Sequence, residues 1–368
     1  MSRISVIQYL RDIIVEYLHS RGIYFGCAMS TTTASVQERP SDCPNTESAN
    51  ILKQTGRRIG FKAVLIAPWL TLNLSHASEP GFVPKEQLVV DNVYAIVGPL
   101  GQRSVANAGL NANYGFVVTE QGVILIDSGA SAHSAAMLEK TIAQVTPKPV
   151  RWVLNTGSQD HRWLGNDYFA RKGVQVHALS ATVQTQKSVA EQQLAGMARF
   201  VGDQMKGTSP RQADLVHPGT AVSLQLGGVQ IQWIDTSAHY PGDTMIYLPK
   251  ASVAFTGDLV YVDRLLGVLP QSNVRKANQA FARLGALSPH HVVPGHGRVT
   301  NMAQAQKETG DYYQFLIANI GSAARNLDPM SETLDKFVSP IQFKHLQNFD
   351  ELHRANMNRV FVDFEANP

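Results

Sequence analysis

Cysteine is scarce in this chain of 368 residues. The two cysteines, Cys27 and Cys43, both lie within the first fifty residues. The rest of the chain can therefore form neither a disulfide bond nor a thiolate metal site. A metal ion bound there would need histidine, carboxylate or water as its ligands.

An excess of charge of one sign is also missing from most of the sequence. The formal net charge is +3, but residues 1–77 hold 8 Lys/Arg and 5 Asp/Glu, which leaves 24 of each (32 − 8 and 29 − 5) for the remainder. A basic face of the kind that binds nucleic acid is therefore not expected. The hydrophobic share of 44% and the charged share of 17% are typical of a soluble globular protein.

Long hydrophobic runs are absent as well. The apolar run at 63–74, AVLIAPWLTLNL, is 12 residues long, whereas a helix needs about 20 to cross a bilayer. Basic residues precede this run from Lys53 onward, and the small residues that a signal peptidase reads follow it, ending at Ala77. This order predicts a secretory signal peptide over residues 53–77. A buried strand or helix is the alternative.

Cleavage near Ala77 would place the protein in the periplasm or outside the cell. A signal peptide normally begins a protein, and this one begins after about fifty residues. Residues 1–52, polar between 30 and 50, are therefore expected to be a disordered extension or to lie upstream of the true translation start.

From Leu88 onward, strand-like and helix-like segments alternate. Strands are predicted at 91–98, 114–129 (a hairpin with its turn at Gln121-Gly122), 150–155, 174–178 and 291–294, and in four segments between 221 and 257. Helices are predicted at 131–145, 164–171, 181–205, 273–284 and 302–325. Two groups of strands with helices between them predict two packed sheets that are covered by helices.

Metal-ligating residue types recur directly after apolar strands. His239 follows the strand that ends at Asp235, Asp258 follows the apolar run at 253–257, and His296 stands in Pro-Gly-His-Gly. Loops at one edge of a sheet can bring such side chains together around a metal ion. The alternatives are a surface histidine before a turn and a carboxylate that caps the next segment.

A further segment of this kind follows the strand predicted at 150–155. Residues 156–161 read Thr-Gly-Ser-Gln-Asp-His and are followed by Arg162. Asp160 and His161 add a carboxylate and an imidazole to the three residues above. A helix is predicted to begin only at Leu164, which leaves these side chains on a loop.

Together, the four segments resemble those of the metallo-β-lactamase superfamily of hydrolases. The resemblance covers about residues 88–300 and implies an αββα sandwich of two mixed β-sheets covered by helices. It also implies that His239 binds the first of two metal ions, that Asp258 bridges both and that His296 binds the second. Residues 301–368 would be a helical C-terminal extension packed on this domain.

The first of the four segments departs from the superfamily pattern Thr-His-x-His-x-Asp-His. An alignment without gaps places Gly157 and Gln159 at the first two histidine positions, with His161 at the aspartate position and Arg162 at the last histidine position. An alignment on the Asp160-His161 pair places Thr156 and Ser158 at the two histidine positions. In both alignments the two histidines of the first metal site are absent.

The sequence therefore predicts a reduced metal site that holds one ion more readily than two. The predicted ligands are Asp160, His161, His239, Asp258 and His296. Imidazoles and carboxylates suit Zn²⁺, with Fe²⁺ as the alternative.

Such a site predicts hydrolysis of an ester, thioester, lactone or amide by a water molecule that the metal activates. Asp160 or Asp258 is the predicted general base, and Arg162 is predicted to bind a substrate carboxylate. The alternative is a non-catalytic binding module on the same fold with a degenerate metal site.

Overall fold

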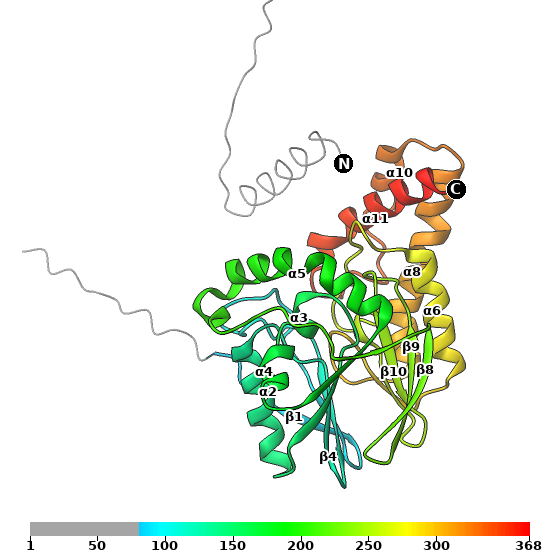
Figure 1. Cartoon of the computed structure of the whole chain (residues 1–368). Coiled ribbons are helices and arrows are strands. Elements are labelled where there is room, and N and C mark those ends of the chain that lie inside the picture. The colour runs from blue at the N-terminus through cyan, green and yellow to red at the C-terminus, as the bar shows by residue number, and fades with distance from the viewer. Residues whose placement is uncertain (1–80) are drawn as a thin grey trace, which may run out of the picture. The chain divides into compact units, whose positions relative to one another are not determined.

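The computed structural model describes residues 81–368 (Figure 1). The predicted extension at 1–52 and the predicted signal peptide at 53–77 lie outside these residues. No helix within 81–368 combines the length and the apolar character needed to cross a membrane.

The first of two sheets contains seven strands that neighbour one another in chain order. They are β1 (Glu86–Val90), β2 (Val93–Ile96), β3 (Tyr114–Thr119), β4 (Gly122–Ile126), β5 (Val150–Leu154), β6 (Gln175–Leu179) and β7 (Leu215–His217). Pairing is antiparallel from β1 to β4 and parallel from β4 to β7. Parallel neighbours need crossover connections, and these carry α2 (Ala132–Val145), α4 (Asn166–Ala170) and α5 (Ser180–Val201).

The second sheet contains five strands in the order β12-β11-β10-β9-β8. They are β8 (Ala221–Leu226), β9 (Val229–Asp235), β10 (Thr244–Leu248), β11 (Val253–Phe255) and β12 (His291–Val293). Only the β11–β12 pair is parallel, and α6 (Val274–Ala286) lies in the connection between these two strands.

Apolar side chains of both sheets meet in one buried layer. Ile124 and Trp152 of the first sheet belong to the same cluster as Trp233 and Phe255 of the second. Gly115 on β3 makes this approach possible, because a Cβ atom there would lie 2.0 Å from Cε1 of Phe255. The predicted arrangement of two mixed sheets covered by helices is confirmed.

The chain after β12 is helical and packs on the outer face of the second sheet. A nearly continuous helix consists of α7 (Met302–Ala305), η3 (Gln306–Gly310), α8 (Asp311–Phe315), η4 (Leu316–Gly321) and α9 (Ser322–Arg325), where η3 and η4 are π-helical. α10 (Met330–Lys336) and α11 (Phe349–Ala366) follow (Figure 1). Buried residues of α8, η4 and α11 share a cluster with Met245 and Val292 of the sheet.

One boundary that matters for the site differs from the prediction. The helix expected from Leu164 begins at Asp160 instead, as α3 (Asp160–Trp163), and the Leu164 N–H donates to the Asp160 carbonyl. The Asp160 carboxylate in the first turn is favourable next to the positive end of the helix dipole. His161 and Arg162 therefore lie on a helical turn and not on an extended loop.

Phe364 of α11 tests whether the C-terminal helices are part of one cooperative unit with the sheets. Its side chain is fully buried, and a Cβ atom on Gly321 would lie 2.3 Å from its ring. We expect Phe364→Ala to lower the free energy of unfolding by about 3–5 kcal/mol, in a single transition measured by urea denaturation. Val362→Ala on the same helix, with 48% of the side chain exposed, should change it by less than about 0.5 kcal/mol. A separate early transition for Phe364→Ala would contradict this.

Candidate metal centre

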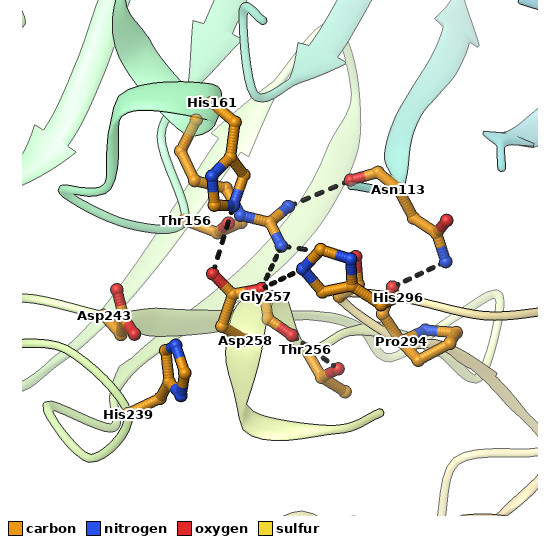
Figure 2. A network of polar contacts seen from close by, with 12 residues as sticks. Asn113, Thr156, His161, His239, Asp243, Thr256, Gly257, Asp258, Pro294 and His296 are labelled. Carbon is orange, nitrogen blue, oxygen red and sulfur yellow. Dashed lines mark hydrogen bonds and ion pairs between the residues drawn. The ribbon is translucent and has the colours of Figure 1, made fainter. Parts of the chain in front are cut away.

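Three of the predicted ligands converge at one edge of the sandwich. His161 lies on α3, Asp258 lies on the short helix η2 (Gly257–Leu259), and His296 follows β12. One donor atom from each residue lies within 4.8 Å of the other two, and all three side chains are buried. His161 Nε2 is 3.2 Å from Asp258 Oδ2, and His296 Nε2 is 3.3 Å from Asp258 Oδ1 (Figure 2).

The hydrogen bond behind His296 determines which ring nitrogen is free. Its Nδ1 lies 2.8 Å from the backbone carbonyl oxygen of Asn111. A carbonyl can only accept, so Nδ1 carries the proton and the neutral ring has a lone pair on Nε2. Burial lowers the pKa of His296 to about 3, although Asp258 opposes this. An unprotonated nitrogen therefore faces a carboxylate oxygen, an arrangement that suits a cation bound between the two.

His161 is held from behind by Asp160. Its Nδ1 is 3.1 Å from Asp160 Oδ1 and also contacts Nη2 of Arg103. Arg103 can only donate, so its contact requires an unprotonated Nδ1, whereas a proton on Nδ1 that is donated to Asp160 leaves the lone pair of Nε2 directed toward Asp258. A carboxylate behind a metal-binding histidine fixes its ring and raises its basicity. Asp160, predicted as a ligand, therefore lies behind His161 and outside the cluster of three.

Arg103 explains the electrostatic state of Asp160. Burial alone would raise the pKa of Asp160, but the Arg103 guanidinium and His161 outweigh this effect and lower the pKa to about 2. Arg103 Nη2 is 2.7 Å from Asp160 Oδ1. Asp160 is therefore ionised throughout the neutral range, and so low a pKa makes it a weak base.

Arg162 lies inside the protein and bridges two carboxylates. Its Nη1 donates to Asp127 Oδ2 at 3.0 Å and to the Asn113 carbonyl oxygen at 2.9 Å, while its Nη2 donates to Asp258 Oδ1 at 2.5 Å. The side chain is 2% exposed. The predicted contact between Arg162 and a substrate carboxylate does not fit this position, because protein acceptors already occupy both terminal nitrogens.

This ion pair controls the charge of Asp258. Burial would favour the neutral acid, but the Arg162 guanidinium reverses that preference and holds the pKa of Asp258 well below its usual range. The other carboxylate, Asp127, accepts from the backbone N–H and the hydroxyl of Thr156 at 2.7 and 2.6 Å. The loops after β4, β5 and β11 are thereby tied together.

His239 lies outside the cluster of three, on the opposite side of Asp258 from His296 (Figure 2). Its Nε2 is 3.3 Å from the hydroxyl of Tyr261, whose ring stacks on His296 with centroids 4.7 Å apart. Burial lowers the pKa of His239 to about 4, which leaves the ring neutral at pH 7.

Close packing around Gly157, on the side of the site where His239 lies, explains why the first metal position lacks a histidine ligand there. A Cβ atom on Gly157, one of the positions that lack a histidine, would lie 2.6 Å from Asp243 Oδ1. The carboxyl group of Asp243 therefore takes the space that a side chain at 157 would need. Burial and the nearby Asp258 carboxylate raise the pKa of Asp243 well above its usual range.

Sequence reasoning missed three residues that position the cluster. Arg103 contacts Asp160 and His161, Tyr261 stacks on His296, and the carbonyl of Asn111 orients the same histidine. Arg103 and Asp160 are 57 residues apart, and Asn111 and His296 are 185 apart. No local pattern marks such pairs, because only the folded chain brings them together.

His161, Asp258 and His296 fit one divalent cation. They offer two imidazole nitrogens and one ionised carboxylate, the number of protein ligands found in catalytic zinc sites, which keep a further position for water or substrate.

Comparison with known proteins identifies the class to which this fold and site belong. The sequence-family model of the metallo-β-lactamase superfamily matches residues 108–296, and the chain belongs to that superfamily. This is a superfamily of metal-dependent hydrolases, which typically bind zinc. The predicted family is thereby confirmed.

Solved structures share the fold at low sequence identity. A metallo-β-lactamase from Pontibacter korlensis is 20% identical with a TM-score of 0.50, and the match covers 63% of this chain and 99% of that one. DIM-1 metallo-β-lactamase exposed to ceftazidime is 16% identical with a TM-score of 0.50, over 64% and 98%. A double mutant of the sec-alkyl sulfatase PisA1 is 17% identical with a TM-score of 0.57, over 77% and 51%.

Removal of the Arg162 charge should lower the free energy of unfolding far more than removal of an exposed charge. Arg162→Met leaves Asp127 and Asp258 buried without their shared partner, so we expect a loss of about 3–5 kcal/mol in the free energy of unfolding. The matched control is Arg171→Met, because Arg171 is 62% exposed and pairs with Asp167 on one helix face. It should cost no more than about 1 kcal/mol. Equal losses in urea denaturation would refute the bridging role.

Proposed function

We propose that this chain is a hydrolase that uses one divalent metal ion, zinc in preference to iron, held by His161, Asp258 and His296. The observation that carries the proposal is the convergence of three buried donor atoms within 4.8 Å, with two imidazole nitrogens turned toward one carboxylate. Membership of a superfamily of metal-dependent hydrolases supports it.

The residues around the cluster orient and charge the proposed ligands. When bound, the metal would lower the pKa of a coordinated water and polarise the group under attack. Asp160 orients His161, and Arg162 orients Asp258 and keeps it ionised. The substrate in this proposal is a small-molecule ester, thioester, lactone or amide.

Proton transfer is assigned to His239 in this proposal. Asp160 and Asp258, the carboxylates predicted as general bases, are engaged by Arg103 and Arg162 respectively. His239 is neutral at pH 7 and lies beside the cluster, with its Nε2 3.3 Å from the hydroxyl of Tyr261. Export to the periplasm or beyond, through the signal peptide predicted at 53–77, is part of the same proposal.

A non-catalytic binding module is the second candidate, and one observation favours it. The Arg162 guanidinium is 2.5 Å from Asp258 and already supplies a positive charge where the metal would bind. Such a protein would be stable without metal. The two candidates therefore differ in metal content and in the response to a chelator.

Metal analysis of the full chain by plasma mass spectrometry tests the proposal. We expect about one equivalent of zinc, and a loss of most of it in His161→Ala and His296→Ala because each variant removes one of three ligands. His290→Ala is the control, since His290 is exposed and outside the cluster. A chelator should lower the melting temperature of the zinc-loaded protein, because a ligand of the native state stabilises it. A protein that contains no metal, and whose melting temperature changes with neither zinc nor chelator, would favour the binding module.

A further inference from the structure

Among residues 81–368, Arg264 is a buried arginine without an ionic partner. It is 6% exposed, and no residue within 81–368 forms a salt bridge or a hydrogen bond with its guanidinium. Its Nε is sealed from solvent and has no acceptor. The two Nη atoms are not sealed in this way, so they reach solvent with their hydrogen-bonding capacity unused.

The position of Arg264 is beside the candidate metal centre. Its guanidinium carbon is 5.8 Å from the centroid of the Tyr261 ring, and that ring stacks on His296. The backbone around it is fixed, because Leu265 N–H donates to the Gln347 carbonyl at 2.9 Å and Gln347 N–H donates to that of Asp263 at 3.0 Å. The C-terminal extension therefore holds the backbone on both sides of Arg264 in place.

An unpaired buried guanidinium is costly for the fold. Removal of a charge from water is unfavourable unless a partner or several hydrogen bonds compensate for it. Burial lowers the pKa of Arg264 below its usual value, although Tyr261 and the Asp258 carboxylate oppose this shift, and Arg103 lowers the pKa further. Arg103 has a carboxylate partner, Asp160, whereas Arg264 has none among residues 81–368.

We propose that Arg264 binds an anionic group of the substrate, a carboxylate, sulfate or phosphate, next to the metal centre. A guanidinium suits these planar or tetrahedral oxyanions because it can donate two parallel hydrogen bonds. The inference rests on the proposed function only in naming the ligand a substrate, and it narrows that substrate to an anionic ester, thioester, lactone or amide.

Titration calorimetry with sulfate, phosphate and acetate tests the anion site without any assay of hydrolysis. The full chain is used before and after removal of metal by a chelator, so that a failure of the metal proposal does not affect the result. At least one anion should bind at about one per chain, and Arg264→Met should weaken its binding by at least about tenfold. The anion that binds most tightly distinguishes carboxylate from sulfate and phosphate recognition.

The matched control is Arg298→Met. Arg298 is 57% exposed and already paired with Asp263, so its removal should leave anion binding unchanged. Arg264→Lys retains the charge and should restore part of the affinity that Arg264→Met loses. Absence of binding by all three anions to the unaltered chain, or equal binding by Arg264→Met, would overturn the proposal.

Thermal unfolding provides a second readout that does not require tight binding. Without anion, Arg264→Met should melt at the same or a higher temperature than the unaltered chain, because an apolar side chain of similar length replaces an unpaired buried charge. The bound anion should raise the melting temperature of the unaltered chain and not that of Arg264→Met. A large loss of stability in Arg264→Met without anion would show a structural role and overturn the proposal.

Discussion

The ion pair of Arg162 with Asp127 and Asp258 is the interaction on which this site depends. Asp127 follows a strand of the first sheet, Asp258 follows a strand of the second, and the guanidinium connects them from α3. All three side chains are buried, so water screens their attraction little. Burial of such charges is tolerable only when their hydrogen bonds are satisfied, and the remaining acceptors and donors here go to Thr156 and Asn113.

This arrangement decides what the metal centre can hold. Asp258 is kept ionised and oriented, and the imidazoles of His161 and His296 face it. The guanidinium already contributes one positive charge to the same carboxylate, so each further cation meets repulsion as well as attraction. Asp243 occupies the space next to Gly157, where a first metal would need a ligand. Both facts favour one cation over two.

Three arginines near the centre differ in how far their charge is compensated. Arg162 donates to two carboxylates and a carbonyl, Arg103 pairs with Asp160, and Arg264 pairs with no residue in the part of the chain that the structure covers. The first two serve the geometry of the cluster. An uncompensated charge costs stability, and proteins tolerate such costs where function needs them. The difference in charge compensation thus separates the two arginines that hold the site together from Arg264, the one proposed to bind an anion.

By itself, the sequence determined the architecture and the core of the site. Apolar runs of strand length, helical periodicity and turn residues predict the two sheets and most helices, because these signals are local. Asp258 and His296 follow buried strands, so the end of the strand fixes where each side chain emerges. The absence of histidine from residues 156–159, which both alignments share, is likewise visible in the sequence and agrees with one reduced metal position.

Only the tertiary structure decided which of three neighbouring residues faces the cluster. Asp160, His161 and Arg162 lie on one helical turn, and successive side chains on a helix point about 100° apart. They therefore have different surroundings: His161 faces Asp258, Asp160 lies behind it beside Arg103, and Arg162 enters the interior. The partners that give each residue its role come from elements far away in the chain, and no local pattern encodes an encounter that arises only when the sheets pack.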